Sequence, residues 1–179
     1  MTTIERRTSE TVVTVEMNIG KGVSRISTGV PFLDHMMTAL SRYSGIDIEI
    51  DADGDLKHHT IEDVAIAAGE AFARTLPVAC ARYGTSTVPM DEALVQVTVD
   101  TGGRPFYHGP LPSSLYDHWM RSFADNARMT LHIRVLRGRD RHHIVEAAFK
   151  ALGFALRQAL VGTDAVFSTK GGVDLDVKS

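Results

Sequence analysis

Cysteine is almost absent from this chain of 179 residues, and long apolar runs are absent altogether. The single Cys80 excludes a disulfide within the chain and favours a reducing compartment. No apolar run approaches the roughly 18 residues that a membrane-spanning helix needs. The first residues also lack the apolar core of a signal peptide. We therefore expect a cytoplasmic protein without a membrane partner.

An excess of positive charge is lacking as well. The 22 Asp and Glu residues outnumber the 19 Lys and Arg residues, which gives a net charge of −3. Nucleic-acid backbones require clustered surplus Lys and Arg, so nucleic acid is excluded as the main partner. The His-Glu-x-x-His pattern of zinc proteases, the Gly-x-Ser-x-Gly elbow of hydrolases, the Walker loop and paired cysteines are all missing.

Histidine, in contrast, is concentrated in a repeated motif. His58-His59-Thr60-Ile61-Glu62 returns 84 residues later as His142-His143-Ile144-Val145-Glu146. The same offset pairs Gly54 with Gly138, Ala67 with Ala151, Gly69 with Gly153, Ala71 with Ala155 and Leu76 with Leu160. Identity at such spaced positions indicates an internal duplication. We expect residues 1–90 to form one half of a catalytic domain and residues 91–179 the other half.

Hydrophobic periodicity predicts strands and helices in a similar order in the two halves. The expected strands are 10–19, 24–28, 46–51, 93–100 and 129–136, and the expected helices are 32–43, 58–82, 115–128 and 142–160. Pro77 is a candidate interruption of the second helix, and residues 162–179 are expected to form an extended loop. These elements predict an α+β protein whose two similar half-domains pack sheet against helix as one compact body.

The repeated motifs are candidate metal sites. Residues four apart on a helix share a face, so His58 and Glu62 can reach one point, whereas His59 lies about 100° around the helix and aims elsewhere. With His35 and His132, the two motifs supply six histidines and two glutamates, enough for two sites of three His and one Glu. Imidazole and carboxylate without thiolate favour a divalent transition metal. We expect an octahedral ion such as manganese, with iron or zinc as alternatives.

Each histidine also has a simpler interpretation. An isolated His-His pair at the start of a helix is usually a polar cap, but repetition with Glu at the same spacing favours ligands. His108 and His118 have no partner in the repeat. We interpret both as polar residues of the surface or core.

With these residues identified, the chain resembles the imidazoleglycerol-phosphate dehydratase family of histidine biosynthesis. Six stretches carry the resemblance, in the order in which the family has them and over nearly the whole chain. They are Gly29-Val-Pro-Phe-Leu-Asp-His-Met36, His58-His-Thr-Ile-Glu-Asp-Val64, Ser122-Phe-Ala-Asp-Asn126, Leu131-His-Ile-Arg134, His142-His-Ile-Val-Glu-Ala147 and Ser168-Thr-Lys-Gly171.

The resemblance implies a fold, ligands and an assembly. The implied fold is a four-layer sandwich of sheets and helices built from two similar halves, and the implied assembly has 24 subunits with metal sites completed across subunit boundaries. Two manganese ions per subunit would be bound by His35, His58, His59, Glu62, His132, His142, His143 and Glu146. The resemblance assigns proton transfer to Glu10 and phosphate binding to Arg82, Arg104, Ser168 and Lys170.

The implied reaction is that of a hydro-lyase, which converts imidazoleglycerol phosphate to imidazole-acetol phosphate. The substrate must lose the hydroxyl next to its ring and a proton from the neighbouring carbon, which is not acidic. Metal ions can serve as Lewis acids and templates, and a carboxylate must then move protons.

Two other functions use the same residues. A two-metal hydrolase of a small phosphorylated metabolite would also need a histidine-rich site beside Arg and Lys. A histidine-rich metal-binding or assembly protein would need no catalytic carboxylate. Product analysis distinguishes the two enzymes, and replacement of Glu10 distinguishes either enzyme from a metal binder.

Overall fold

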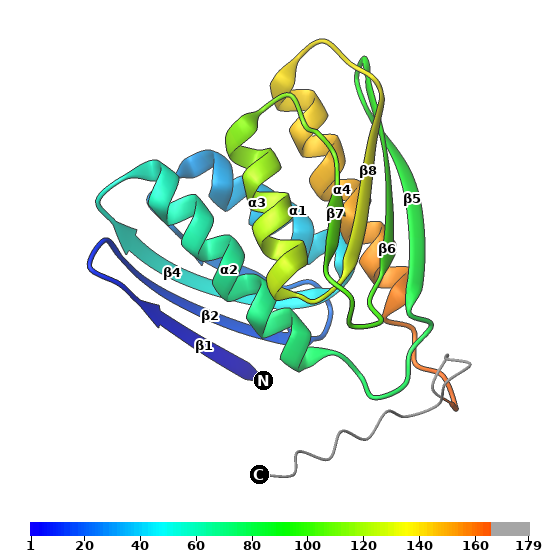
Figure 1. Cartoon of the computed structure of the whole chain (residues 1–179), viewed down its shortest axis with the longest axis horizontal. Helices are drawn as coiled ribbons and strands as arrows, with labels where there is room; N and C mark the ends of the chain where they lie inside the picture. The colour runs from blue at the N-terminus through cyan, green and yellow to red at the C-terminus, as the bar shows by residue number, and fades with distance from the viewer. Residues whose placement is uncertain (166–179) are drawn as a thin grey trace, which may run out of the picture.

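The computed structural model describes residues 1–165, which form two sheets and four helices (Figure 1). The first half contains β1 (Thr2–Arg7), β2 (Thr11–Ile19), β3 (Ser24–Ser27), α1 (Pro31–Ser44), β4 (Ile46–Gly54) and α2 (Lys57–Thr75). The second half contains β5 (Tyr83–Met90), β6 (Ala93–Asp100), β7 (Phe106–His108), α3 (Ser114–Asn126), β8 (Thr130–Arg137) and α4 (Arg141–Ala159). None of these four helices is both long and apolar enough to cross a lipid bilayer.

The two sheets have the same topology. Their strand orders are β1-β2-β4-β3 and β5-β6-β8-β7. Strand β3 pairs with β4 in parallel, as β7 does with β8 in the other sheet. The remaining strand pairs of both sheets are antiparallel. Val13 pairs with Ala52 in the first sheet and Val97 with Ile133 in the second, and all four side chains are buried. Each sheet therefore turns one apolar face toward the interior.

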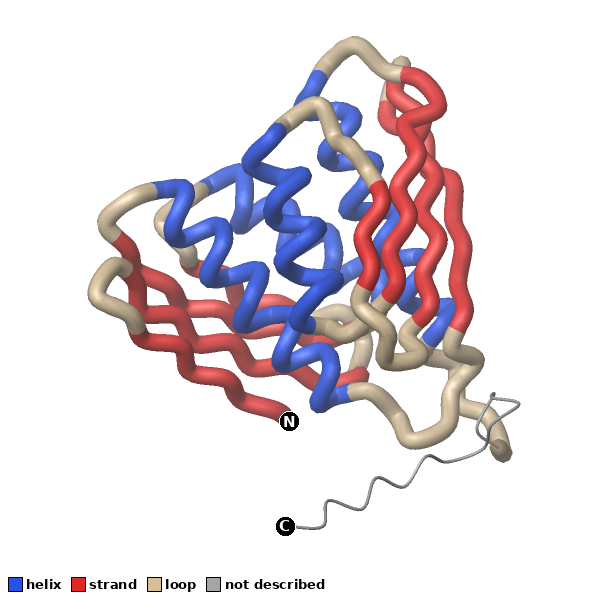
Figure 2. The backbone as a smooth tube through the Cα atoms, viewed as in Figure 1, coloured by secondary structure: helices blue, strands red, loops and turns tan. Residues whose placement is uncertain are grey.

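Two helices cover the inner face of each sheet. Helices α1 and α2 pack on the first sheet, α3 and α4 pack on the second, and the pairs meet through α1 with α4 and α2 with α3. The sheets are thus the outer layers and the helices the two inner layers (Figure 2). This arrangement confirms the predicted α+β four-layer sandwich of two similar halves.

The glycines that the repeat pairs lie where the helical layers come closest. A Cβ at Gly69 of α2 would lie 2.7 Å from the backbone oxygen of Phe123 on α3. A Cβ at Gly153 of α4 would lie 2.7 Å from the Cβ of Tyr43 on α1. Neither position has space for a side chain, so the duplicated glycine permits both contacts between helices.

Some elements differ from the expectation. Helix α2 ends at Thr75 and not at 82, because Leu76 precedes Pro77 and a residue in that place avoids the helical conformation. The periodicity does not predict β1, β5 or β7. Strands β1 and β5 are outer strands with many exposed residues, which weakens the apolar signal. Because β5 pairs with β6, the second sheet starts at Tyr83, ahead of the expected division at residue 90.

Candidate metal centre

All four helices begin at the same end of the inner layers, and most predicted ligands lie there. Phe32 at the start of α1 contacts the ring of Tyr116 at the start of α3, with 5.0 Å between ring centroids. It also contacts the ring of His142 at the start of α4, at 4.7 Å. His118 of α3 in turn contacts Glu62 near the start of α2. We call this part of the molecule, the first two turns of the four helices, the ligand end.

Three predicted ligands meet between α1 and α4. Nε2 of His35 lies 3.4 Å from Oε1 of Glu146, and Nε2 of His142 lies 3.3 Å from Oε2 of the same carboxylate. We call these three residues the Glu146 cluster. Glu146 is only 5% exposed, and Lys150, one turn further along α4, contacts its Oε1 at 2.7 Å.

Lys150 keeps the Glu146 carboxylate charged. Burial by itself raises the pKa of Glu146, but the hydrogen bond and charge of Lys150, with a smaller contribution from His35, outweigh burial. The pKa of Glu146 therefore lies below its ordinary value. A carboxylate must be ionised to bind a metal ion, so the side chain is in the appropriate form.

A second cluster lies between α2 and α3. Nε2 of His58 lies 3.7 Å from Oε2 of Glu62, and Nε2 of His118 lies 3.2 Å from Oε1. We call His58, Glu62 and His118 the Glu62 cluster. His118, which the sequence interprets as a polar residue of the surface or core, is a partly exposed residue that contacts the repeated glutamate. The Glu62 side chain is 36% exposed, in contrast to the buried Glu146.

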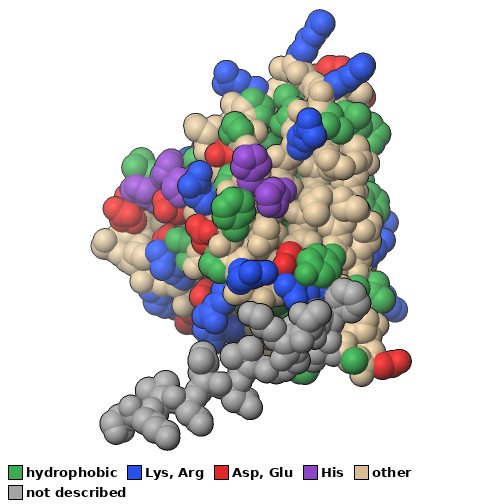
Figure 3. All heavy atoms as spheres, turned by 45° about the vertical axis from the view of Figure 1, so that its right-hand side comes forward, with side chains coloured by type: hydrophobic (Ala, Val, Ile, Leu, Met, Phe, Trp, Pro, Cys, Tyr) green, Lys and Arg blue, Asp and Glu red, His purple; other side chains and the backbone are tan. Residues whose placement is uncertain are grey.

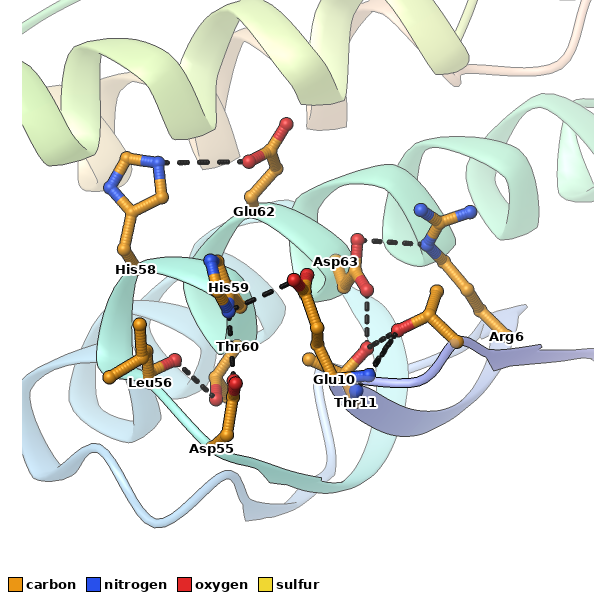
Figure 4. A network of polar contacts seen from close by, with 11 residues as sticks. Arg6, Glu10, Thr11, Asp55, Leu56, His58, His59, Thr60, Glu62 and Asp63 are labelled. Carbon is orange, nitrogen blue, oxygen red and sulfur yellow. Dashed lines mark hydrogen bonds and ion pairs between the residues drawn. The ribbon is translucent and has the colours of Figure 1, made fainter.

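The second histidine of each motif points away from its cluster, as the helical spacing predicts. Figure 4 shows His58 directed at Glu62 and His59 directed at Asp55 and Glu10. Nδ1 of His59 lies 2.8 Å from Asp55 and 3.5 Å from Glu10. A neutral ring that donates Nδ1–H to a carboxylate keeps a lone pair on Nε2, which is the usual arrangement of a metal-binding histidine.

His143 has the equivalent arrangement in the second half. Its Nδ1 lies 2.8 Å from Glu92, and its Nε2 lies 3.6 Å from Asp91. The Glu92 carboxylate also accepts hydrogen bonds from the backbone N–H groups of Asp140, at 2.8 Å, and Arg139, at 3.0 Å. These bonds, that of Asp140 first, lower the pKa of Glu92 to about 2. The pKa of His143 is raised by Glu92, and that of His59 is raised by Asp55.

His132 does not reach either cluster of its own chain. It lies on β8, where its ring is 5.5 Å from those of His108 and Phe106. Together with Arg134 and Gln96 it lines a shallow hollow of about 690 Å³ on the second sheet. Figure 3 shows histidine side chains in two separate groups on one face of the molecule.

The predicted phosphate-binding arginines lie at the opposite end of the helices. The backbone N–H of Arg82 donates to the carbonyl of Ala159, the last residue of α4, at 2.8 Å. His142 is 17 residues earlier on α4, so about 25 Å separates the two ends at 1.5 Å per residue. The carbonyl of Arg104 accepts a hydrogen bond from Thr130, just after α3.

Asp100 pairs with Arg82 and lies near the charge of Arg104. Its carboxylate accepts hydrogen bonds from Nε of Arg82 at 2.6 Å and from Nη2 at 3.0 Å. The hydrogen bonds from Arg82, and to a smaller extent the charge of Arg104, hold the pKa of Asp100 below its ordinary value despite burial. The structure thus brings Arg82 and Arg104 to one surface, while the predicted Ser168 and Lys170 lie outside the described residues.

The two clusters fit part of a metal coordination sphere. Their Nε2–Oε separations of 3.2–3.7 Å are close to those of two ligands that each lie about 2.1 Å from one ion. Imidazole and carboxylate donors without thiolate suit manganese. Among residues 1–165, however, no group of three His, Cys, Asp or Glu side chains is arranged to hold an ion by itself. An ion at either cluster would therefore need further ligands.

Comparison with known proteins identifies the family. The model of the imidazoleglycerol-phosphate dehydratase family matches residues 28–156. The chain belongs to this family. A dehydratase of Kineococcus radiotolerans is 46% identical over 193 residues, covering 95% of this chain and 97% of its own length. A dehydratase of Clostridium botulinum is 43% identical over 187 residues, covering 94% and 95%.

Solved imidazoleglycerol-phosphate dehydratases have the same fold. The Pyrococcus furiosus structure is 41% identical with a TM-score of 0.86 and covers 95% of this chain and 100% of its own. The Staphylococcus aureus structure is 34% identical with a TM-score of 0.78, covering 91% and 100%. The predicted family, fold class and enzyme class, a hydro-lyase of histidine biosynthesis, are confirmed. The metal, its ligands and the assembly stay predictions.

Several residues that contact predicted ligands are not predicted from the sequence, among them Asp55 beside His59 and Asp91 beside His143. Lys150 contacts Glu146, His118 contacts Glu62 and Glu92 contacts His143. Lys150 could have been found from its position four residues after Glu146 on a helix. His118 follows Asp117 as His35 follows Asp34, but at an offset of 83 residues instead of 84.

Proposed function

We propose that the chain dehydrates imidazoleglycerol phosphate to imidazole-acetol phosphate with two manganese ions per subunit, in active sites formed between subunits. The observation that carries the proposal is the pair of matching clusters at the ligand end, where two imidazoles face each repeated glutamate. Family membership supports the reaction. Its diffusible metabolites are consistent with the cytoplasmic location that the sequence predicts.

The ligands divide into those within the clusters and those outside them. The proposed set is His35, His58, His59, Glu62, His132, His142, His143 and Glu146. Five of these lie in the two clusters, whereas His59 and His143 are directed elsewhere and His132 lies on the second sheet. We assign these three to metal sites of neighbouring subunits. When bound, the ions supply Lewis acidity to the imidazole and hydroxyl groups of the substrate.

The separation of ligands and arginines supports an assembly. The ring and the phosphate of the substrate are joined by a short carbon chain, but about 25 Å separates the ligand end from Arg82. One chain therefore does not supply both the metal ligands and the phosphate site to one substrate molecule. Contact between the ligand end of one subunit and the arginine end of another would do so, and we propose that this contact recurs in a closed 24-subunit particle.

Glu10 is the proposed proton-transfer group. Its Oε2 lies 3.5 Å from Nδ1 of His59, and its side chain is 54% exposed (Figure 4). When His59 enters the site of a neighbouring subunit, Glu10 enters with it and reaches the substrate beside the metal. There its carboxylate can take the proton from the substrate carbon next to the one that carries the leaving hydroxyl. It can then give this proton to the hydroxyl, which departs as water.

Arg82 and Arg104 are proposed to bind the phosphate, with Ser168 and Lys170 from beyond the described residues. Asp100 fixes one edge of the Arg82 guanidinium, which orients the side chain before substrate arrives. Guanidinium groups recognise phosphate through paired N–H donors, and a lysine adds a point charge.

Product analysis tests the reaction. Purified protein with Mn²⁺ is incubated with imidazoleglycerol phosphate, and the keto phosphate and inorganic phosphate are both measured. We expect the keto phosphate without release of inorganic phosphate. Release of inorganic phosphate as the main product would instead establish the two-metal hydrolase.

Replacement of Glu10 tests the catalytic assignment. Glu10→Gln is expected to lower kcat by ~10²–10⁴-fold, since that is the usual contribution of a positioned proton-transfer group. Metal content and particle size should not change, because the amide is isosteric. Glu5→Gln, an exposed carboxylate of the same hairpin, is the control and should keep full turnover. Retained turnover in Glu10→Gln refutes the role of Glu10.

A further inference from the structure

A buried polar group adjoins the turn that carries Glu10. Asp63 of α2 is 8% exposed and Thr11 of β2 is 3% exposed, and the Thr11 hydroxyl donates a hydrogen bond to Oδ2 of Asp63 (Figure 4). Oδ1 of Asp63 lies 2.9 Å from Nε of Arg6 on β1. We call Arg6, Thr11 and Asp63 the Asp63 triad. None of the proposed metal ligands belongs to it.

The second half has apolar residues in the equivalent places. A Cβ at Gly54 would lie 3.0 Å from Cγ2 of Thr11, and a Cβ at its repeat partner Gly138 would lie 3.2 Å from Cβ of Ala93. Thr11 and Ala93 are therefore equivalent. The strand register and the 84-residue repeat identify the other two counterparts. In the order of the Asp63 triad, the equivalent residues are Val88, Ala93 and Ala147, and all three are buried.

Polar side chains are thus not required for folding at this place. Replacement of a buried ionic group by well-packed apolar residues is often neutral or even stabilising. The second half has such packing, whereas the first half keeps three polar side chains. The Asp63 triad is therefore better explained by what it positions than by a gain in stability.

The turn next to the Asp63 triad also differs between the halves. Oγ1 of Thr8 accepts the backbone N–H groups of Glu10, at 3.1 Å, and Thr11, at 3.0 Å, and it lies 3.2 Å from the Thr11 hydroxyl. In the equivalent turn Asp91 has a positive φ of 47°, whereas neither Ser9 nor Glu10 is among the non-glycine residues of the described chain with positive φ. Hydroxyl groups thus set the conformation of the first turn, and Asp63 anchors one of them.

This conformation leaves the Glu10 side chain unused by the loop. The backbone carbonyl of Glu10 accepts the N–H of Asp55 at 3.0 Å, so main-chain atoms hold the loop before α2. In the second half the carboxylate of Glu92 holds the loop before α4 by accepting two backbone N–H groups. The Glu10 carboxylate instead lies beside His59 and is 54% exposed.

We propose that Asp63 is a positioning residue for Glu10. By accepting the Thr11 hydroxyl, it holds the turn in the conformation that keeps the Glu10 carboxylate at the ligand end, where it reaches the substrate. This inference rests on the proposed function, in which Glu10 transfers the proton. A displacement of ~1 Å in an active site can lower the rate by about 10²-fold, so loss of this anchor should be measurable.

Steady-state kinetics of the full chain with Mn²⁺ and imidazoleglycerol phosphate test the proposal. Thr11→Val removes the hydroxyl at nearly constant volume, and Thr11→Ser keeps it. We expect Thr11→Val to lower kcat by roughly 10–10²-fold with KM within a few-fold of the parent chain, and Thr11→Ser to restore kcat. Hydrogen exchange of the backbone N–H groups of residues 8–11 should be faster in Thr11→Val. Thr3→Val, on the exposed face of β1, is the matched control and should keep full turnover.

A double-mutant cycle isolates the effect that passes through Glu10. In the Glu10→Gln background, Thr11→Val should cause no further loss of kcat, because the carboxylate that the hydroxyl positions is already absent. A loss that multiplies with that of Glu10→Gln would overturn the proposal. If Thr11→Val does not fold, the triple variant Arg6→Val, Thr11→Ala, Asp63→Ala replaces it, since this variant reproduces the packing of the second half. It should show the same low kcat and the same dependence on Glu10.

The remaining outcomes separate this inference from the proposed function. If Glu10→Gln loses turnover but Thr11→Val keeps it, Asp63 has no positioning role and the proposed function stands. If Thr11→Val loses metal or dissociates the particle, the Asp63 triad supports the metal site and the proposal is wrong. If the parent chain forms no keto phosphate, the proposed function fails and this inference fails with it.

Discussion

Each half of the molecule has a glutamate at the turn before its second strand, Glu10 in the first half and Glu92 in the second. Glu92 accepts hydrogen bonds from two backbone N–H groups and contacts the ring of His143. In the first half a different residue, Asp55, lies 2.8 Å from the ring of His59, and Glu10 lies 3.5 Å from it. The duplication has thus left one glutamate tightly bonded and its equivalent more loosely placed.

This difference explains why the two glutamates suit different tasks. The hydrogen bonds to Glu92 lower its pKa to about 2, so it remains charged near neutral pH and is unsuited to exchanging protons there. It holds the loop before α4 and the ring of His143 instead. In the first half Asp55 makes the shorter contact with the motif histidine, and the 54% exposed side chain of Glu10 stays free for the proton transfer that we propose for it.

The two helices that carry the motifs differ in a similar way, since α4 has more stabilising contacts at its first turns than α2. Asp140 caps α4 by accepting the N–H of His142 at 2.7 Å, whereas Leu56 at the start of α2 gives no side-chain cap. Glu146 is buried with Lys150, whereas Glu62 is partly exposed. Each motif glutamate contacts a histidine of the other half, His35 for Glu146 and His118 for Glu62, but the second half adds a helix cap and a lysine of its own.

The largest expected effect concerns a feature common to both halves. In each half, the second histidine of the motif is directed away from the cluster of its own chain. His59→Ala and His143→Ala should each remove one of the two ions per chain and dissociate the particle, because each ring is proposed to join a neighbouring subunit. Light scattering with metal analysis measures both quantities. Equal effects support equivalent roles of the two halves, and an effect of one variant alone breaks the equivalence.

A second pair of variants keeps the imidazole rings of His59 and His143 but changes the carboxylates that orient them. Asp55→Asn and Glu92→Gln keep the histidines but weaken the carboxylate partner on Nδ1. Both should lower metal affinity by roughly 10–100-fold without removing the site. An intact, fully metallated particle in His59→Ala and His143→Ala would contradict the bridging role.

A smaller effect is expected from the lysine that distinguishes the halves. Lys150→Met leaves the buried Glu146 carboxylate without its cation, which should lower the free energy of unfolding of the metal-free chain by about 2–4 kcal/mol. Urea unfolding followed by fluorescence of the single, buried Trp119 measures this. Arg74→Met is the matched control, since Arg74 pairs with Glu70 four residues earlier on the exposed face of α2 at 3.2 Å. That change should cost ~0.3–0.5 kcal/mol. Equal losses in the two variants would show that the Lys150 pair is an ordinary surface pair.

The sequence predicts the duplication because both halves need the same residues at the same helical positions. Gly69 and Gly153 each permit a close contact between helices, and the His-His-x-x-Glu motif begins α2 and α4 alike. Outer strands obey weaker constraints, since one edge and much of one face meet solvent. Strands β1 and β5 could therefore lose the apolar alternation that reveals a strand, and the sequence argument misses them.

The candidate site is predicted only in part, for two physical reasons. His118 is equivalent to His35 in space, but His118 precedes His142 by 24 residues whereas His35 precedes His58 by 23, so a constant offset of 84 does not align them. His132 lies on the second sheet, away from both clusters. The role that we propose for it depends on contacts with other subunits, which neither the sequence pattern nor the fold of one chain contains.

The smallest expected effect concerns the helix caps. Substitutions can remove the side-chain cap of α4 and give one to α2. Asp140→Ala should lower the free energy of unfolding of the metal-free chain by about 1 kcal/mol, because the N–H of His142 loses its acceptor. Leu56 has extended backbone angles, φ −129° and ψ 140°, as a capping residue requires, and its side chain is 56% exposed. Leu56→Ser should therefore stabilise the chain by about 0.5–1 kcal/mol. Amide hydrogen exchange in the first turns of α2 and α4 should show protection rising at His58 and His59 and falling at His142 and His143. If Leu56→Ser did not raise the protection of the first turn of α2, the missing cap would not be the cause of its low protection. The exposed Glu62 cluster would then have to be the cause.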